Sequence, residues 1–231
     1  MYERKWAFRE TELTIKSDSE RAIEVAIGAS LEARRQLEKF VARYPEFRSS
    51  LEPVRLDEDS YPKVVELMLR AAEIVGVGPF AAVAGSISQL AAEAGMGAGA
   101  ANILVDNGGD ISMIGDRDFR VGIYAGDSTV SGKFALLVKA EDLPLGVCTS
   151  SGSIGHSTSF GDADAVVVVA REASVADAAA TAVANEVRGS EVDSSIRRGL
   201  DRARAISEIQ GCLIVRGKNV GTYGKFILAP C

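Results

Sequence analysis

The sequence predicts a single α+β domain in which a largely antiparallel sheet is covered by helices. Residues up to about 100 show mainly helical spacing of apolar side chains, whereas residues 102–170 show short apolar strands. Glycine and aspartate separate those strands at short intervals, which favours antiparallel hairpins over helical crossovers. No long linker interrupts the 231 residues, so one domain is expected, with two similar lobes that share one sheet as the alternative.

We divide this domain into three parts. A strand and helices occupy about residues 1–75, and a C-terminal helix and hairpin occupy about residues 189–231. The part between them, about residues 76–188, carries the motifs discussed below.

Composition narrows the class of protein. A hydrophobic content of 47% excludes a disordered chain, and a net charge of −6 without a basic stripe argues against a nucleic-acid partner. The apolar stretch at 80–94 is shorter than a membrane span and contains Gln89 and Glu93. The N-terminus lacks the apolar segment of a secretory signal, and the three cysteines form no CxxC motif. We therefore expect a cytoplasmic protein without a membrane partner.

The N-terminal part is expected to contain one strand and two helices. Residues 8–16 alternate in polarity, as a strand does. Ser17-x-x-Glu20 has the capping-box pattern that opens a helix, which continues until Pro45. After a charged connection, Pro62 occupies the first turn of the second helix. The apolar faces of these helices complete the core or form the contact of a homodimer.

The sequence Gly76-x-Gly78-x-x-Ala81 imitates a dinucleotide-binding fingerprint. Such a fingerprint must follow a strand, and here it follows a helical pattern, with Pro79 where a backbone N–H would be needed. We expect a turn between helices, with the alternative that the helix opened by Pro79 directs its N-terminus at a phosphate. That helix runs to about Ala94 and is rich in small residues, which permit close approach to a neighbour or a ligand.

The second half of the chain is expected to combine short strands with two helices. Residues 165–170 are all apolar, which is typical of a central strand buried on both faces. The other expected strands cover 103–105, 110–114, 119–124, 134–138, 146–148, 213–216 and 223–228, and the helices cover 174–187 and 193–206. The last two strands form a hairpin.

The first candidate binding motif is Asn107-Gly108-Gly109-Asp110, which lies between two expected strands. Asn-Gly is a strong hairpin signal, so the plain interpretation is a turn. The functional interpretation is that the two glycines let backbone N–H groups approach a ligand, while the carboxylate of Asp110 accepts a hydrogen bond. Taken alone, the motif favours the turn.

The second motif is the stretch 148–160, which contains seven hydroxyl side chains, two glycines and the only histidine, His156. Hydroxyls and unobstructed N–H groups are suited to surrounding a phosphate. The cofactor-binding candidates in this stretch are Thr149, Ser150, Ser151 and Gly152. A solvated loop is the plain interpretation, and a hydrolase that pairs a serine with His156 is a weaker one, since the GxSxG pattern is absent.

Asp177 and Thr181 form the third motif. Residues four apart on a predicted helix share one face, roughly 5–6 Å apart at Cβ. A carboxylate and a hydroxyl suit Mg²⁺, which completes its shell with carbonyls, water and phosphates. The structural alternative is that Ser174-x-x-Asp177 is a capping box and that Thr181 bonds back to a carbonyl. Taken alone, the pattern favours the cap.

In this order, the motifs resemble the FAD:protein FMN transferase superfamily, also described as thiamine-biosynthesis lipoprotein-like. The similarity covers about residues 76–188 and is greatest to a small, uncharacterised prokaryotic branch. The markers of that branch are Gly78–Gly85, Asp106–Asp110, Gly146–Gly152, Gly155–Ser157, Ala163–Val166 and Ala176–Thr181. The resemblance implies a T-fold-like architecture, with or without internal duplication, that holds FAD across its middle.

The resemblance also implies a metal-assisted reaction. Asp177 and Thr181 match the residues that ligate Mg²⁺ at the FAD pyrophosphate while FMN passes to a protein threonine and AMP leaves. The family resemblance therefore favours the metal interpretation of this pair over the cap. A small-molecule flavin or nucleotide is the expected partner.

The remaining motif residues receive roles from the same resemblance. The Gly108-Gly109 turn and the segment 150–152 cradle the pyrophosphate or the ribityl chain. Asp110 and His156 are polar contacts, and His156 is the first candidate for proton transfer because its ordinary pKa lies near neutrality.

Three departures from the superfamily bear on the reaction. The His-x-x-Asp-Pro-x-Thr-Gly segment of the transferases is missing, because Ser-Thr-Ser-Phe follows His156. Their lysine in the helix that matches 86–94 is absent, and so is an exported, lipid-anchored N-terminus. We expect a Mg-dependent flavin- or nucleotide-binding protein with an FMN transferase-like activity, and a non-catalytic cofactor carrier is the alternative.

Overall fold

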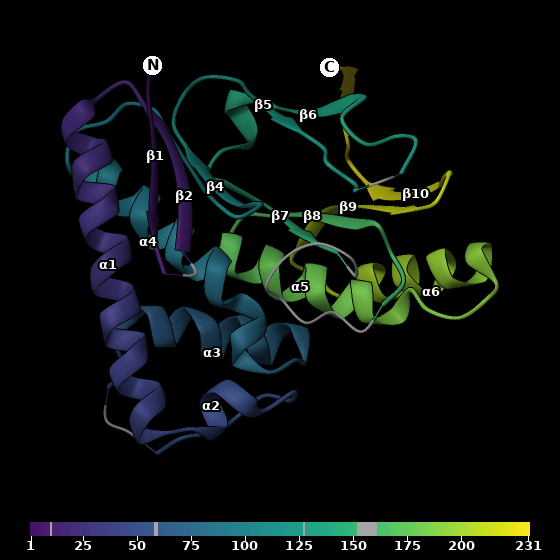
Figure 1. The fold of residues 1–231 in the computed structure, drawn as a ribbon, viewed down its shortest axis with the longest axis horizontal. Coiled ribbons are helices and arrows are strands. Elements are labelled where there is room, and N and C mark those ends of the chain that lie inside the picture. Colours follow the sequence, from purple (N-terminus) through teal and green to yellow (C-terminus); the bar gives the residue numbers. More distant parts are fainter. Residues whose placement is uncertain (10, 58–59, 127, 152–160) are drawn as a thin grey trace.

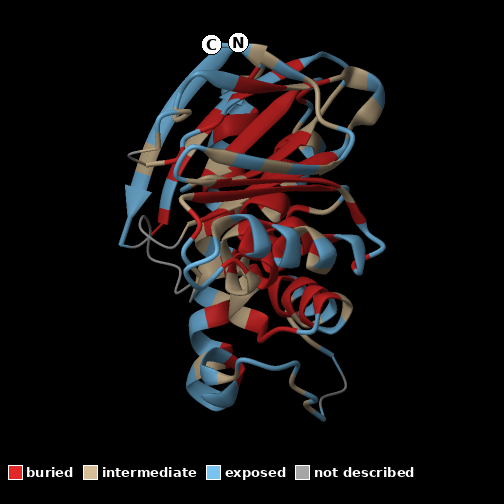
Figure 2. Cartoon of the chain, turned by 90° about the vertical axis from the view of Figure 1, so that its right-hand side faces the viewer, coloured by how far each residue is buried: buried red, intermediate tan, exposed pale blue. Residues whose placement is uncertain are grey.

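The computed structural model describes residues 1–9, 11–57, 60–126, 128–151 and 161–231. An eight-stranded sheet lies between a layer of helices and a three-stranded sheet, and all described strand pairs are antiparallel (Figure 1). Buried residues concentrate in the central strands and on the helix surfaces that face them (Figure 2). The predicted fold class, a largely antiparallel sheet covered by helices, is confirmed.

The large sheet has the order β1-β2-β3-β4-β7-β8-β9-β10, and the small sheet has the order β11-β6-β5. The strands of the large sheet are β1 (Tyr2–Phe8), β2 (Thr11–Ser17), β3 (Ile103–Asn107), β4 (Asp110–Ile114), β7 (Leu145–Ser150), β8 (Ala165–Ala170), β9 (Ile209–Arg216) and β10 (Asn219–Gly224). Those of the small sheet are β5 (Phe119–Gly122), β6 (Phe134–Val138) and β11 (Leu228–Pro230). The helices are α1 (Glu20–Arg43), α2 (Glu46–Ser49), α3 (Lys63–Val75), α4 (Val83–Gly97), α5 (Ala173–Glu186) and α6 (Val192–Arg204), with short 3-10 helices η1 (Pro79–Ala82) and η2 (Ala140–Asp142).

The large sheet contains the same arrangement twice. β1 and β2 lead into the helices α1 to α4 and then into β3 and β4, and β7 and β8 lead into α5 and α6 and then into β9 and β10. The two units meet where β4 pairs with β7, a meeting place that we call the seam. Both units thus follow one order of two strands, helices and two strands, and β5 and β6 of the small sheet are inserted between them.

Strand β8 shows how the core is divided. All 6 residues of Ala165–Ala170 are buried. Val166 and Val168 pack in the cluster on the helix side, while Val167 and Val169 pack in the cluster beneath the small sheet. Because both faces are covered, the strand shows no alternation of polarity, and its predicted central position is confirmed.

The N-terminus forms a hairpin instead of the single strand expected over residues 8–16. β1 pairs with β2 along its whole length, with Tyr2 opposite Ser17 and Phe8 opposite Thr11. β2 alternates between buried and less buried residues, whereas every residue of β1 except Trp6 is exposed. An edge strand without a buried face gives no alternation that a sequence pattern can reveal.

The first helix has a different cap from the one expected. Ser19 is the N-cap of α1, and its hydroxyl accepts a hydrogen bond from the N–H of Ala22 at 3.2 Å. The hydroxyl of Ser17 instead donates to the carbonyl of Asn102 at 2.9 Å. The capping-box prediction for Ser17 was wrong because that side chain is the last of β2 and bonds toward the β3 side of the sheet.

The C-terminal hairpin is also shifted. β10 covers 219–224 in place of the expected 223–228 and pairs with β9. The chain then leaves the large sheet, and Leu228–Pro230 pairs with β6 in the small sheet. The sequence pattern had merged two strands that belong to different sheets.

The Gly76-x-Gly78 sequence forms the expected turn between α3 and η1. Gly76 ends α3 in the left-handed conformation with φ 75°. A Cβ on Gly78 would lie 1.8 Å from the carbonyl oxygen of Ser50, so this turn is packed against the chain. The alternative of a phosphate at this helix start therefore finds no open space beside Gly78.

Within the described ranges, no single helix has the length and apolar composition of a membrane span. Helix α3 and the η1–α4 segment pass that test only as a pair, with a bend of 108° between them.

Candidate functional site

Polar side chains from both units converge on the helix-facing side of the seam. Asp110 begins β4 and lies opposite Cys148 of β7, and Ser150 follows on the same face of β7 two residues later. Across from these strands, α5 carries Asp177. The charge of Asp177 acts on both Asp110 and Cys148, which places the three side chains in one neighbourhood.

Two glycines bring α5 close to the seam. A Cβ on Gly146 of β7 would lie 2.4 Å from the Cα of Ala173, and a Cβ on Gly85 of α4 would lie 2.3 Å from its carbonyl oxygen. The same Cβ on Gly85 would lie 2.7 Å from the Cβ of Asp177. Only glycine fits at these two positions, and the close approach sets where the carboxylate of Asp177 lies.

Asp177 caps the neighbouring helix. Its Oδ2 accepts a hydrogen bond from the N–H of Gly85 at 2.8 Å, and the N–H of Ala84 also stabilises the carboxylate. Helix α4 has no side-chain cap of its own on its N-cap residue, so Asp177 supplies the acceptor for its first turn. Two backbone N–H groups of α4 thus hold the carboxylate in one orientation.

The capping box Ser174-x-x-Asp177, the structural alternative to the metal interpretation, is not formed. Ser174 lies inside α5, whose N-cap is Glu172. Its hydroxyl donates to Oε1 of Gln89 at 3.1 Å, and its N–H donates to the same oxygen at 3.3 Å. The capping box does not form because α5 begins at Ala173, one residue earlier than predicted, and because Gln89 of α4 accepts the hydrogen bonds of Ser174.

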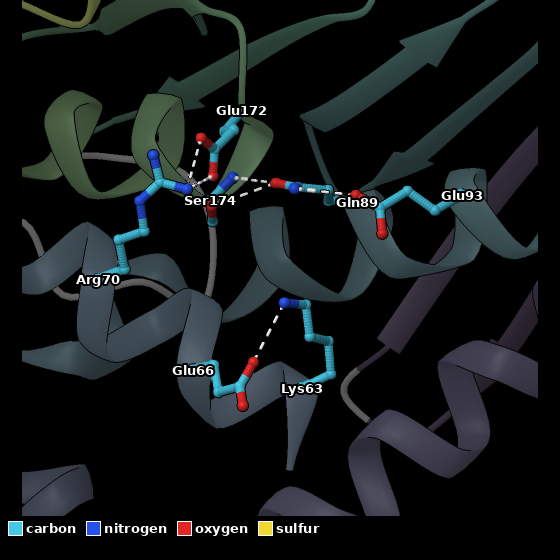
Figure 3. A network of polar contacts seen from close by, with 7 residues as sticks. All are labelled: Lys63, Glu66, Arg70, Gln89, Glu93, Glu172 and Ser174. Carbon is cyan, nitrogen blue, oxygen red and sulfur yellow. Dashed lines mark hydrogen bonds and ion pairs between the residues drawn. The ribbon is translucent and has the colours of Figure 1, made fainter. Parts of the chain in front are cut away.

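Gln89 links α4 to the start of α5, as Figure 3 shows. Its Nε2 donates to Oε1 of Glu93 at 3.0 Å, so both ends of the buried amide are engaged. Arg70 of α3 forms an ion pair with Glu172 at 2.9 Å, at the same end of α5 (Figure 3). These contacts fix α5, and with it Asp177, relative to α3 and α4.

Burial governs the electrostatics of the seam. It raises the pKa of Asp177 to about 7, against the N–H groups of Gly85 and Ala84, which lower it. Burial, followed by the charge of Asp177, raises the pKa of Asp110 well above its usual range. Burial also raises the pKa of the Cys148 thiol, so this cysteine stays protonated and donates to the carbonyl of Ala173 at 3.3 Å.

Some buried oxygens of the seam lack partners. Oδ1 of Asp110 and Oγ of Ser150 have no hydrogen-bond partner within the described part of the chain, and Ser150 is only 3% exposed. Oγ of Ser86, the residue after Gly85, is in the same condition. Because buried polar atoms are nearly always paired, the first two point to a group that belongs between the strands and α5.

The glycine turn next to Asp110 is a tight hairpin. Gly108 and Gly109 have φ values of 67° and 103°, and the N–H of Gly109 donates to Oδ1 of Asp106 at 2.8 Å. The side chain of Asn107 donates to the carbonyl of Ala84 at 3.2 Å, which ties the turn to α4. Nothing lies within 4 Å of a Cβ built on Gly108. The turn is therefore both structural and open on its outer side.

A cavity of about 460 Å³ adjoins this turn. It lies between the turn and the N-terminal hairpin, and its lining residues are Lys5, Trp6, Ala7, Glu12, Leu13, Thr14, Asp106, Gly108 and Gly109. A volume of this size is in the range of small-molecule sites. Burial raises the pKa of Asp106 at its edge.

The structure brings part of the expected site together. Asn107, Asp110, Ser150 and Asp177 share the helix-facing side of the seam, and Thr181 lies one turn further along α5, half-buried. The side chain of Thr149 lies on the other face of β7, and only its N–H acts on Asp110.

Two expected residues, Gly152 and His156, lie outside the described residues. Ser151 is the last described residue before them. In the described part of the chain, no group of three or more histidine, cysteine, aspartate or glutamate side chains is placed to hold a metal ion. A metal at the seam would therefore depend on few carboxylates together with hydroxyls, water and ligand oxygens.

Sequence patterns missed Gly85, Gln89 and Cys148 as parts of this site. The signal for Gly85 was the run of small residues in its helix, which predicts close approach without saying to what. Cys148 belonged to a predicted motif but received no role, and Gln89 gave no signal, because their partners Asp110 and Ser174 are distant in the chain.

A family model and several relatives match most of the chain. The family model described as AbpE bacteria matches residues 3–213. The chain is 45% identical over 199 residues to a UPF0280 protein of Methanothermobacter thermautotrophicus, covering 86% of this chain and 77% of that one. It is 48% identical over 202 residues to a UPF0280 protein of Methanosphaerula palustris, covering 86% and 84%.

Solved structures share the fold at low sequence identity. The ApbE protein of Thermotoga maritima superposes with a TM-score of 0.61 at 15% identity, covering 95% of this chain and 96% of that one. The flavinyl transferase ApbE of Pseudomonas stutzeri superposes with a TM-score of 0.59 at 16% identity, covering 96% and 93%.

Proposed function

The chain belongs to the AbpE bacteria family, a branch of the ApbE-like flavin transferase superfamily, and from that membership we propose that it binds FAD or another flavin nucleotide together with Mg²⁺ at the seam. The observation that carries the proposal is the pair of buried carboxylates, Asp110 and Asp177, beside oxygens that have no partner in the described chain. An anionic pyrophosphate is compatible with such a site only if a cation accompanies it.

The donor set of the seam fits Mg²⁺. Asp177 and Thr181 present a carboxylate and a hydroxyl from successive turns of α5, and Oδ1 of Asp110 is an orphaned acceptor nearby. All of these are oxygen donors, which hard cations prefer. Asp177 is oriented by the N–H of Gly85, the kind of support that metal-binding carboxylates receive.

The surroundings also fit a flavin nucleotide. The open Gly108-Gly109 turn and the hydroxyl of Ser150 are suited to the phosphate and ribityl groups. The cavity on the other side of the turn, with Trp6 in its wall, has the size and the aromatic surface that a flavin ring requires. A flavin nucleotide that extends over the Gly108-Gly109 turn would place its phosphates at the seam and its ring in the cavity.

The chemistry proposed for the site is FMN transfer. An acceptor hydroxyl oxygen forms a bond to the FMN phosphorus, the bond from that phosphorus to the AMP oxygen breaks, and a base takes the hydroxyl proton. A bound Mg²⁺ would supply stabilisation of the charge that develops on the phosphate oxygens. His156, which lies outside the described residues, is the candidate base, while Asn107 and Gly85 hold the turn and Asp177 in place.

The test is a titration of FAD fluorescence with the protein, first with Mg²⁺ and then with a chelator. We expect saturable, Mg²⁺-dependent binding, which Asp177→Asn abolishes and the control variant Asp201→Asn retains, because Asp201 is an exposed aspartate of α6 that pairs with Arg204 of the same helix. Equal affinity in chelator would remove the metal from the proposal. If no flavin nucleotide binds in either condition, the proposed ligand class is wrong.

One observation favours a second function, a non-catalytic cofactor carrier. Helix α4, which contacts the carboxylate of Asp177, contains neither lysine nor arginine along Val83–Gly97, whereas the transferases carry a lysine in this helix. A cation at that place stabilises a developing phosphate charge, so its loss removes catalytic power more than affinity. A carrier would bind FAD stoichiometrically and release no AMP during prolonged incubation with Mg²⁺.

A further inference from the structure

Asp110 is the least compensated group in the seam. The charges of Asp177 and Asp106 act on it unfavourably, and its favourable contacts are the thiol of Cys148 and the N–H of Thr149. Within the described ranges, neither Asp110 nor Asp177 forms an ion pair with a lysine or arginine. Without a cation, ionising both of these neighbouring carboxyls is costly at low local dielectric, and the pKa values of both are raised accordingly.

The positions of the polar atoms indicate which kind of group would lie between the two carboxyls. Asp110 projects from β4 toward α5, on the face that Cys148 and Ser150 of β7 share. Oδ2 of Asp177 is already engaged by Gly85, while Oδ1 of Asp110 and Oγ of the 3%-exposed Ser150 are buried and unpaired within the described chain. A group placed between β4, β7 and α5 would satisfy Oδ1 of Asp110 and Oγ of Ser150 and would lie beside the carboxylate of Asp177.

We propose, on the basis of the function proposed above, that Asp110 is a second carboxylate ligand of the seam cation and that the protein binds this cation before the nucleotide. A site with one carboxylate depends on substrate phosphates to complete the metal shell. A site with two carboxylates neutralises the charge of a divalent cation without them. The nucleotide then meets a site whose negative charge is already cancelled.

The donors also specify the class of cation. Asp110, Asp177 and the neighbouring hydroxyls offer oxygen only, and the thiol of Cys148 is protonated and bonded to Ala173. Oxygen donors favour Mg²⁺ and Mn²⁺, whereas Zn²⁺ favours thiolate and imidazole. The seam is thus built for a hard divalent cation.

The test uses Mn²⁺ as the probe and the full chain without nucleotide. Free Mn²⁺ is followed by electron paramagnetic resonance during titration of the wild-type protein and of Asp110→Asn, Asp177→Asn and Asp201→Asn. Asp201→Asn is the control, because Asp201 is an exposed aspartate of α6 whose carboxylate pairs with Arg204 of the same helix, away from the seam. We expect one Mn²⁺ site in the wild type and the control, and an affinity at least about tenfold lower in each of the other two variants.

The outcomes separate this inference from the flavin proposal. If Asp177→Asn loses Mn²⁺ and Asp110→Asn keeps it, the role of Asp110 is wrong while the flavin proposal stands. If the nucleotide-free wild type binds no Mn²⁺ but FAD binding requires Mg²⁺, the cation arrives with the nucleotide and the inference is overturned. If FAD does not bind but the Mn²⁺ site depends on both carboxylates, the inference holds and the flavin proposal fails.

Thermal melting in chelator checks that the variants are folded. Asn is a neutral isostere of a carboxylate that is repelled in the native state, so neither Asn variant should melt below the wild type without metal. Added Mn²⁺ should raise the melting temperature of the wild type and of Asp201→Asn only. A Mn²⁺-induced rise of equal size in Asp110→Asn would contradict the proposal independently of the titration.

Discussion

Gly85 of α4 lies so close to Ala173 of α5 that a Cβ on Gly85 would stand 2.3 Å from the carbonyl oxygen of Ala173. The atoms in the way are backbone atoms, which cannot rotate aside as a flexible side chain can. The distance between the two helices, and with it the position of Asp177, therefore depends on the absence of a single methyl group.

Replacement of Gly85 by Ala should force α4 and α5 apart. We expect a loss of roughly 1–3 kcal/mol in the free energy of unfolding, as for other overpacked sites, together with loss of Mg²⁺-dependent ligand binding. Urea denaturation and the FAD titration measure the two effects. Gly97→Ala in the same helix is the control, because nothing lies within 4 Å of a Cβ there. Equal effects in the two variants would contradict the close-approach argument.

Metal-free protein should lose stability as the pH rises. Burial raises the pKa of Asp177 from 3.8 to about 7, so between these values the native state holds a proton that the unfolded state has released. The stabilisation is complete below the lower value and is lost as the pH passes the upper one. At about 1.4 kcal/mol per pKa unit, the effect is on the order of a few kcal/mol.

The measurement is urea denaturation in chelator at about pH 5 and about pH 8, within the range where a carboxyl with this pKa titrates. Asp177→Asn does not titrate, so its stability relative to the wild type should improve as the pH rises. Added Mg²⁺ should remove the difference in the wild type. Parallel pH profiles for the two proteins would show that Asp177 is ionised throughout.

Replacement of Gln89 by Leu should destabilise the start of α5. The hydroxyl and the N–H of Ser174 would lose their shared acceptor inside the protein, which costs roughly 1–3 kcal/mol. Glu93→Ala removes the exposed partner of the same amide and should change stability by less than about 0.5 kcal/mol. Thermal or urea denaturation of both variants makes the comparison, and similar losses would mean that the contact with Ser174 is unimportant.

Flavin binding should quench the fluorescence of Trp6, the only tryptophan of the chain. Trp6 lines the cavity beside the glycine turn, where the proposed ligand would place its ring. Inorganic pyrophosphate with Mg²⁺ has no ring and should leave the emission unchanged. Trp6→Leu should weaken FAD binding by a few-fold, since aromatic contacts contribute about 0.5–1.5 kcal/mol. Unchanged emission at saturating FAD would place the ring elsewhere.

Local signals in the sequence predicted local structure well. The apolar run of β8, the turn at Asn107–Asp110 and the helix that follows Pro79 are all present. Each of these elements is determined by residues that are close together in the sequence. The exposed β1 was missed for the same reason, because a strand without a buried face has no pattern to recognise.

The site was harder to predict because its contacts are long-range. Asp177 appeared in the sequence as a helix cap or a metal ligand, and in the structure it caps a different helix through Gly85. Nothing near Asp177 in the sequence identifies that partner. The family resemblance singled out both Asp110 and Asp177, but only the strand register and the packing of α5 place them together.

The two-unit arrangement of the large sheet has a thermodynamic consequence. Because β4 and α4 come from one unit and β7 and α5 from the other, neither unit alone contains the complete seam. A ligand bound there gains its affinity only when both units are folded and docked. The binding free energy is therefore lost when either unit unfolds, which couples the unfolding of the two units. Ligand-saturated protein should unfold in a single transition even if the two units differ in stability in the ligand-free protein.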